Sequence, residues 1–159
     1  MSYILKSMGT EIEIDDIDRK IIEMLQKDSR VSFVEIAKVV GLSDPAIHSR
    51  VRKLQEADII EKFTTVLTPE KVDKGIAAFI EINVKPNTIE EVIKNLERLD
   101  AVLEIHVTFG EYDIIVKTRT KTNEELGQML SEDIRTIPHI TNTRVTTVLE
   151  TRKEEQLKI

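Results

Sequence analysis

The stretch from Ser32 to Ala57 constrains the fold of this 159-residue chain more than any other part of it. Ser32 and Glu35 have the spacing of a capping box, which predicts that a helix begins there. Gly41 suits the left-handed backbone position that follows a helix, and Pro45 suits the first turn of a second one. We therefore predict two short helices joined by a tight turn at Gly41.

The second predicted helix, capped by Ser43 or Asp44, has two unlike faces. Ile47, Val51 and Leu54 recur at spacings of four and three residues, which indicates one buried stripe. Short side chains near the start and cations around the middle cover the rest, and this arrangement suits insertion into the major groove of double-stranded DNA. The candidate DNA contacts are Ser43, Pro45, Ala46, His48, Ser49, Arg50, Arg52 and Lys53. A helical hairpin with a solvated charged face would show the same pattern, so both interpretations stay open at this point.

Composition and charge restrict the class of protein. Apolar residues make up 40% of the chain and charged residues 33%, as in soluble globular proteins. No apolar run reaches the ~20 residues that span a bilayer, no signal-peptide pattern opens the chain, and cysteine is absent. We therefore expect a cytoplasmic protein without membrane contact or disulfides. The net charge of −6 disfavours tight nonspecific coating of DNA by a monomer and favours discrete sites engaged by a dimer or larger assembly.

The sequence offers no candidate catalytic, metal or cofactor site. His48, His106 and His139 are widely separated, and neither a His-x-x-x-His pair nor a cysteine pair supplies metal-ligand spacing. His106 lies two residues from Glu104, a pair that is common on exposed sheet faces. No glycine-rich phosphate loop or nucleophile elbow appears. We therefore expect that the protein is not an enzyme.

Shifts in pattern divide the chain into five segments. We expect an N-terminal arm over residues 1–13, a DNA-binding domain over 14–62, a linker strand over 63–75, a larger domain over 76–152 and a tail over 153–159. Within the DNA-binding domain, Asp15 or Asp16 caps a further helix, which completes a unit of three helices. The β-branched and aromatic residues between 59 and 67 predict a short strand pair, or wing.

The second half of the chain repeats one pattern twice. Residues 88–91 and 122–125 have the spacing of capping boxes. Each of these two segments precedes a predicted helix with one apolar face. The predicted strands span residues 76–84, 102–109, 112–118 and 140–149. The order βαββαβ specifies an α+β ferredoxin-like sandwich, with helices on one face of the sheet. The opposite face carries enough apolar character to pair with a second copy.

The whole arrangement resembles the Lrp/AsnC family of feast-or-famine regulators, in the form found in archaea or thermophiles. The resemblance covers residues 14–150 and implies an N-terminal winged helix-turn-helix followed by a ferredoxin-like (RAM- or ACT-like) domain. Its motifs are Asp15-Asp16-Ile17-Asp18-Arg19-Lys20-Ile21-Ile22, Gly41-Leu42-Ser43, Arg50-Val51-Arg52-Lys53-Leu54, Phe109-Gly110-Glu111-Tyr112-Asp113 and Ile137-Pro138. Two positions depart from the family pattern: Asp58 stands where glycine is usual, and Lys62-Phe63 replaces a common Gly-Tyr. Aspartate tolerates a left-handed conformation, so the departure concerns the wing and not the fold.

The resemblance also implies partners and an effector site. Such proteins form homodimers through their ferredoxin-like domains, often assemble into octamers, and read pseudo-palindromic DNA. An amino acid bound between neighbouring domains shifts their assembly or DNA affinity. Carried onto this chain, the effector site comprises Gly110, Glu111, Tyr112, Asp113, Ile140, Thr141, Asn142, Thr143 and Thr146. Asp113 would pair with an ammonium group, and the neutral side chains of 141–143 favour glutamine or asparagine ahead of leucine.

Other interpretations remain. Without the resemblance, residues 110–113 would be interpreted as a plain hairpin turn. The leading function is a ligand-responsive, sequence-specific transcriptional regulator. The alternative is an architectural DNA-compacting protein with little ligand response, which a salt-dependent and sequence-indifferent affinity would favour. An enzyme on the ferredoxin-like scaffold is a third class, and it lacks a convergent acid–base or metal set here.

Overall fold

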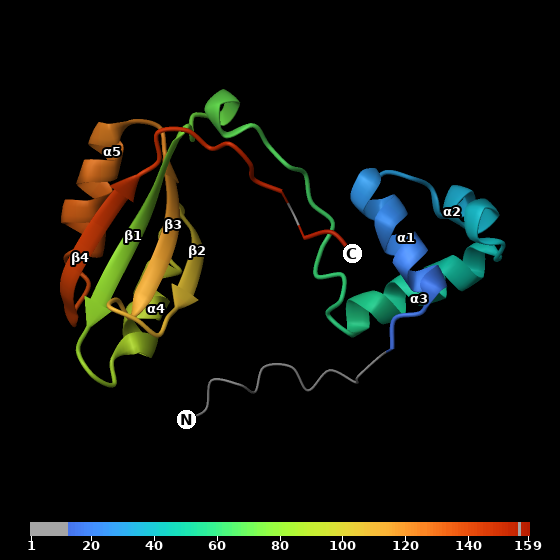
Figure 1. Ribbon diagram of the computed structural model, residues 1–159, viewed down its shortest axis with the longest axis horizontal. Coiled ribbons are helices and arrows are strands. Elements are labelled where there is room, and N and C mark those ends of the chain that lie inside the picture. The colour runs from blue at the N-terminus through green and yellow to red at the C-terminus, as the bar shows by residue number, and fades with distance from the viewer. Residues whose placement is uncertain (1–12, 156) are drawn as a thin grey trace. The chain divides into compact units, whose positions relative to one another are not determined.

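The computed structural model describes residues 13–155 and 157–159, which form two compact units (Figure 1). One unit contains the described residues up to Val66 together with those after Glu154, and the other runs from Leu67 to Glu154. The predicted N-terminal arm lies outside the described residues, except for Glu13. Within the described chain, no helix has both the length and the apolar character needed to cross a membrane.

Three helices form the first unit: α1 (Asp16–Lys27), α2 (Phe33–Val40) and α3 (Asp44–Glu56). Each turns one apolar stripe inward, because its buried side chains recur every three or four residues. The shared core consists of Ile21, Leu25, Ile36, Ala37, Ile47 and Val51. The predicted three-helix unit and the buried stripe of its last helix are confirmed.

Local capping rules account for most ends of these helices. Asp15 caps α1, and Asp18 completes a reciprocal capping box with it. Gly41 follows α2 with φ of 74°, a left-handed geometry that glycine adopts at no steric cost. Ser32 Oγ accepts from the N–H of Glu35 at 3.2 Å, whereas the reciprocal bond from the Glu35 side chain does not form.

The predicted strand pair between residues 59 and 67 is wrong. Asp58 turns the chain after α3 with φ of 55°, and the segment then continues without a strand to the 3₁₀ turn Pro69–Val72. Phe63 and Val66 are exposed along it. Residues of high β propensity pair only where another segment offers its edge, and the described part of this unit contains no strand. Within the described residues, the helix-turn-helix therefore has no wing.

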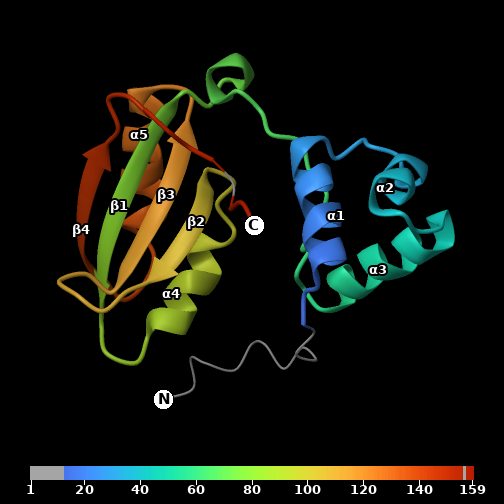
Figure 2. The same ribbon diagram turned by 45° about the vertical axis from the view of Figure 1, so that its right-hand side comes forward.

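The second unit is a four-stranded antiparallel sheet with helices on one face (Figure 2). Its elements are β1 (Ile76–Val84), α4 (Ile89–Leu96), β2 (Val102–Val107), β3 (Ile114–Thr120), α5 (Asn123–Gln128), the π-helical turn η2 (Met129–Ile134) and β4 (Ile140–Thr147). The strand order is β2-β3-β1-β4. This confirms the predicted βαββαβ order and the ferredoxin-like architecture. The third strand begins at Ile114 and not at Tyr112, because a turn occupies the residues before it.

The core of this unit lies between the helices and one face of the sheet. The strands contribute Ala78, Ile80, Ile82, Ile114 and Val116, and the helices contribute Val92, Leu96, Leu126, Met129 and Ile134. Met129 and Ile134 are five residues apart yet both buried, because the π-helical turn is wider than an α-helical one. The opposite sheet face, toward the viewer in Figure 2, is not covered by α4, α5 or η2.

The two predicted capping boxes of this unit differ in outcome. Thr122 Oγ1 accepts from the N–H of Glu125 at 3.1 Å, which is half of the predicted box, while Glu125 Oε2 accepts from the N–H of Lys121 and does not complete it. The prediction for residues 88–91 is wrong, because Thr88 Oγ1 donates to the carbonyl of Lys85 at 2.8 Å and makes no cap bond to α4. A hydroxyl within reach of a preceding carbonyl has an alternative to capping.

Candidate nucleic-acid interface and effector loop

The apolar stripe of α3 is buried in the core of the first unit, so the opposite face of the helix is exposed to solvent. Ile47, Val51 and Leu54 are at most 2% exposed. Of the predicted DNA contacts, Ser43, Pro45, His48, Arg52 and Lys53 are exposed and Ala46, Ser49 and Arg50 are half-buried. The structure thus brings all eight together on one helix and its cap.

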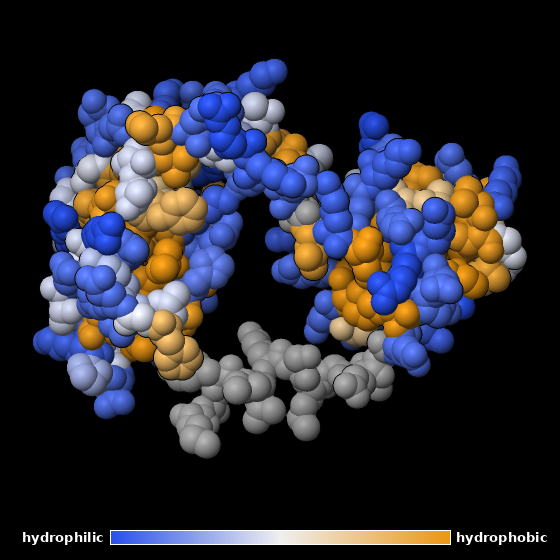
Figure 3. Space-filling view, viewed as in Figure 1, coloured by the Kyte–Doolittle hydropathy of each residue, from blue (hydrophilic) through white to orange (hydrophobic). Residues whose placement is uncertain are grey.

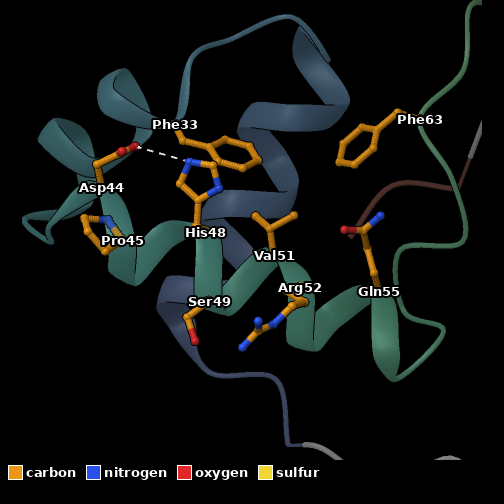
Figure 4. Close-up of a pocket in the computed structure, with 9 residues that line it drawn as sticks. All are labelled: Phe33, Asp44, Pro45, His48, Ser49, Val51, Arg52, Gln55 and Phe63. Atoms are coloured by element: carbon orange, nitrogen blue, oxygen red, sulfur yellow. Dashed lines mark ion pairs between the residues drawn. The ribbon is translucent and has the colours of Figure 1, made fainter.

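An open groove of about 550 Å³ lies beside α3 (Figure 4). It is lined by Phe33, Asp44, Pro45, His48, Ser49, Val51, Arg52, Gln55 and Phe63. The His48 ring packs edge-on against the Phe33 ring, with centroids 4.6 Å apart, and Asp44 Oδ1 lies 3.8 Å from His48 Nε2. Polar atoms of His48, Ser49 and Arg52 therefore line one surface that a nucleic acid can approach.

Five of these lining residues were not among the predicted contacts, and one of them, Val51, belongs to the predicted buried stripe. Asp44 and Gln55 share a helical stripe with His48 and Arg52, at spacings of four and three, so periodicity would have found them. The two phenylalanines carry no such signal. One lies on α2 and the other in the segment after α3, and only the tertiary fold brings them to the groove.

Arg52 and Lys53 project their charges outward from α3. Arg52 Nε lies 3.6 Å from Glu56 Oε1, and the two side chains are 72% and 67% exposed. An exposed pair of this kind contributes only ~0–1 kcal/mol, so it yields readily to a stronger anion. Lys53 is exposed as well. Both cations are accordingly available to a phosphate backbone.

Arg50, in contrast, is turned from the outer face toward α1. Its Nη1 donates to Asp15 Oδ2 at 2.7 Å and to Asp18 Oδ1 at 2.8 Å, and its side chain is 29% exposed. The hydrogen bond from the backbone N–H of Asp18, followed by that from Arg50, lowers the pKa of the Asp15 carboxyl. The Nη1 atom of the guanidinium is therefore occupied within the unit.

The predicted effector loop, residues 110–113, connects β2 to β3 and is firmly held. Thr108 donates from its N–H to the carbonyl of Asp113 at 2.9 Å and from Oγ1 to the carbonyl of Tyr112 at 2.6 Å. The Asp113 carboxylate accepts from the N–H of Val84 at 2.8 Å through Oδ2. A Cβ built on Gly110 would meet no atom within 4 Å. The loop therefore has a fixed backbone and open space beside its glycine.

The start of β4 reaches the same end of the sheet as this loop. The register places Asn142 opposite Asn83 and Ile140 opposite Val84, with Thr141 in the irregularity between them. Asn83 Nδ2 also donates to the carbonyl of Glu111 at 2.7 Å. The loop and the start of β4 thus lie on opposite sides of β1, at the same end of the sheet. Asn83 was not predicted, although its alternation along β1 could have placed it on the open face.

The remaining predicted effector residues do not all face one way. Thr143 lies opposite Ile82, whose side chain belongs to the core, and its Oγ1 accepts from Arg135 Nε at 3.2 Å. Thr146 lies opposite Phe79, on the open sheet face. Because side chains alternate along a strand, Asn142 and Thr146 share the open face and Thr143 points to the helix side.

Two cations of β3 on the open sheet face are already paired. Lys117 Nζ lies 3.0 Å from Glu104 Oε1 and also contacts Glu154, while Arg119 donates to Glu154 Oε2 at 2.7 Å. The Lys117 and Arg119 side chains are only 15% and 9% exposed. Hydrogen bonds from Lys117 lower the pKa of Glu104 and of Glu154, and the bond to Glu154 raises the pKa of Lys117.

The rest of this face is a mixture of apolar and charged side chains. Phe79 is 40% exposed. Arg144 Nε lies 3.3 Å from Glu81 Oε2, an ion pair without hydrogen-bond geometry, so that buried oxygen accepts no hydrogen bond. Figure 3 shows apolar and hydrophilic patches interleaved over the sheet unit. The described residues, 13–155 and 157–159, contain no group of three histidine or carboxylate side chains placed to hold a metal.

Two family models match the sequence. The AsnC-type helix-turn-helix domain matches residues 14–55, and the Lrp/AsnC ligand binding domain matches residues 77–157. The chain is 42% identical over 143 residues to the HTH-type transcriptional regulator FL11 of Pyrococcus abyssi, covering 90% of this chain and 94% of that protein. It is 33% identical over 145 residues to the leucine-responsive regulatory protein of Escherichia coli, covering 89% and 88%.

Solved structures of similar proteins have the same fold. Escherichia coli AsnC superposes with a TM-score of 0.88 at 32% identity, covering 93% of this chain and 100% of that one. The Neisseria meningitidis transcriptional regulator NMB0573, in complex with L-Met, superposes with a TM-score of 0.82 at 23% identity, covering 89% and 94%. These similarities extend over both units of the chain.

Proposed function

Because the chain belongs to the Lrp/AsnC family of transcriptional regulators, we propose that it binds specific DNA sequences through α3 and responds to an amino-acid effector. The observation that carries the proposal is the buried stripe of α3, which leaves a polar and cationic face to solvent. The protein then acts by binding and not by catalysis.

On α3, short and cationic residues have different tasks. Ala46 and Ser49 lie nearer the N-terminus of the helix, where small side chains permit close approach to base edges. Arg52 and Lys53 lie further along, where exposed cations contact phosphate. Ser43, Pro45 and His48 complete the surface that meets the duplex.

The effector site that we propose lies at the loop end of the sheet. Open space beside Gly110 permits a ligand to approach the backbone, and Asp113 uses Oδ2 for Val84 N–H, which leaves its second oxygen for an α-ammonium group. Asn83 and Asn142, opposite each other on the open face, offer amide partners. These polar groups favour glutamine or asparagine as effector. The complex of NMB0573 with L-Met supports an amino acid as the ligand class.

We further propose that the open sheet face pairs with a second copy, and that such dimers assemble into octamers. Phe79 is exposed on a sheet face that α4 and α5 do not cover, and a second copy would remove its apolar surface from water. Light scattering at micromolar concentration should find at least a dimer. A stable monomer would contradict this part of the proposal.

In vitro selection from a random duplex pool tests the DNA function directly. Enrichment of a defined, two-fold related sequence is expected. Equal affinity for all duplexes, with steep salt dependence, would instead indicate the architectural role.

A thermal-shift screen of the twenty amino acids, with and without the selected duplex, tests the effector. Asp113→Asn keeps an acceptor for Val84 N–H but removes the charge, so it should abolish the response and leave DNA binding intact. Asp133→Asn, an exposed change on η2, is the matched control. If calorimetry finds that Asp113→Asn binds the effector as tightly as the unaltered protein, the site lies elsewhere.

A further inference from the structure

Arg50 links the middle of α3 to the N-terminus of α1. A single guanidinium nitrogen donates to Asp15 at 2.7 Å and to Asp18 at 2.8 Å. The same two aspartates form the capping box that begins α1. The Asp18 side chain is only 9% exposed, so the contact ties α3 to a largely buried carboxylate.

The other flank of α3 is held by an aromatic contact. Successive residues of an α-helix are rotated by about 100°, so His48 lies about 100° to one side of the buried Ile47 and Arg50 about 60° to the other. His48 packs edge-on against Phe33 of α2, as Figure 4 shows. The apolar stripe is therefore bracketed by a contact with α1 on one flank and with α2 on the other.

We infer that Arg50 is a positioning residue, which fixes the rotation of α3 about its own axis and makes no phosphate contact itself. The inference rests on the proposed function, because rotation matters only if α3 aims side chains such as Ser49 and Arg52 at DNA. A helix held by apolar contacts alone can roll, since those contacts are non-directional. Charge-assisted hydrogen bonds are short and directional, so the bonds to Asp15 and Asp18 set the angle.

A roll of α3 would affect base reading and phosphate attraction differently. Hydrogen bonds to base edges require exact alignment, whereas counterion release depends on how many cations lie near the backbone. Loss of Arg50 should therefore reduce the preference for a specific sequence and leave the salt dependence unchanged. Loss of a direct contact such as Arg52 should reduce the salt dependence.

The test compares Arg50→Ala with Arg52→Ala, since each removes one cation from α3. Full-length protein is titrated at several salt concentrations with the most enriched duplex from in vitro selection and with a random-sequence duplex of equal length. Arg52→Ala should lower the slope of log K against log salt by about one per bound subunit. Arg50→Ala should keep the slope of the unaltered protein, while its ratio of specific to random affinity falls by about tenfold or more.

Asp15→Asn provides a second variant away from the outer face of α3. Asparagine still caps a helix, so α1 keeps its start, but one charged acceptor of Arg50 is lost. We expect the ratio of specific to random affinity to fall by about threefold, a smaller loss than in Arg50→Ala, because Arg50 keeps its bond to Asp18. Loss of a negative charge would by itself raise the affinity for both duplexes, so a fall in the ratio cannot come from the field alone.

Circular dichroism establishes that each variant is folded at the assay temperature. A purely structural role would lower the melting temperature and leave the affinity ratio unchanged, which would overturn the inference. A lowered salt slope for Arg50→Ala would also overturn it, because Arg50 would then be a phosphate contact. If the unaltered protein prefers no sequence, both the proposed function and the inference about Arg50 are wrong. If the preference for the selected duplex is unchanged in Arg50→Ala, only the inference about Arg50 is wrong.

Discussion

The two units each present a pair of cations, and the pairs differ in what already neutralises them. Arg52 and Lys53 on α3 are exposed, and Arg52 has only a loose surface pair with Glu56. Lys117 and Arg119 on β3 are almost fully buried beneath carboxylates of the same unit. The residue types are alike, so counting basic residues does not locate a site for an anion. What distinguishes the pairs is whether the chain itself supplies the counter-charge.

The largest expected effect comes from removing the exposed pair. Arg52→Ala combined with Lys53→Ala should lower affinity for the selected duplex by at least ~1–3 kcal/mol, because both side chains are free to contact DNA. The free energy of unfolding should change by less than ~0.5 kcal/mol, since exposed substitutions of this kind are mild. A gel-shift titration at fixed salt measures the first and urea unfolding the second. Unchanged DNA binding would mean that Arg52 and Lys53 do not contact DNA, and that their exposure does not distinguish them from Lys117 and Arg119.

A smaller effect is expected from the buried pair, and it should appear in stability. Arg119→Ala should destabilise the sheet unit by about 2 kcal/mol, because it removes the Arg119 donor from the carbonyl of Lys74 and leaves Glu154 with Lys117 as its remaining cation. Lys121→Ala is the control on the same stretch of chain, since that side chain is 59% exposed in its pair with Asp73. The control should shift urea unfolding by less than ~0.5 kcal/mol. If the two variants unfold alike, the buried pair is no different from a surface one.

The smallest expected effect is a change in the pH dependence of stability, caused by the carboxylates that pair with Lys117 and Arg119. The pKa values of Glu104 and Glu154 are lowered in the folded protein, first by hydrogen bonds from Lys117, so their contribution to stability is present above the ordinary glutamate pKa. It is lost as the pH falls through these lowered pKa values, below the ordinary glutamate pKa. Both side chains are more than a third exposed, at 45% and 44%, so the loss should not exceed about 1 kcal/mol.

Glu154→Gln isolates this contribution, because glutamine does not titrate. Urea unfolding of the variant between pH 6 and pH 3 should show a shallower loss of stability than the unaltered protein. Identical pH profiles would mean that Glu154 is not held by the cations of β3.

Local signals in the sequence predicted most of the fold. Asp15, Gly41 and Thr122 act through neighbours within a few residues, and the structure has them as helix caps or as a left-handed turn. The βαββαβ order followed in the same way, from alternating and helical periodicities. The strand pair at residues 59–67 failed because β propensity reports only the local preference and not whether a partner edge exists.

The candidate sites were less predictable, because their contacts join distant residues. Arg50 reaches Asp15, which is 35 positions away, and Asp113 reaches the N–H of Val84, which is 29 positions away. Helical periodicity placed Arg50 on a candidate DNA-binding face, and the family resemblance placed Asp113 in the candidate effector loop. Neither signal could reveal that one carboxylate oxygen of Asp113 and one guanidinium nitrogen of Arg50 were already engaged within the fold.

The π-helical turn after α5 has a consequence for changes in chain length. Each of its bonds encloses one residue more than an α-helical bond, so the segment Met129–Ile134 contains a residue in excess of what an α-helix needs. Deleting the exposed Ser131 would shorten the spacing between Met129 and Ile134 to the four residues that share one face of an α-helix. The same deletion within α4 would rotate Leu96 out of the core by about 100°. One helix of the sandwich can therefore be shortened without repacking, while the other cannot.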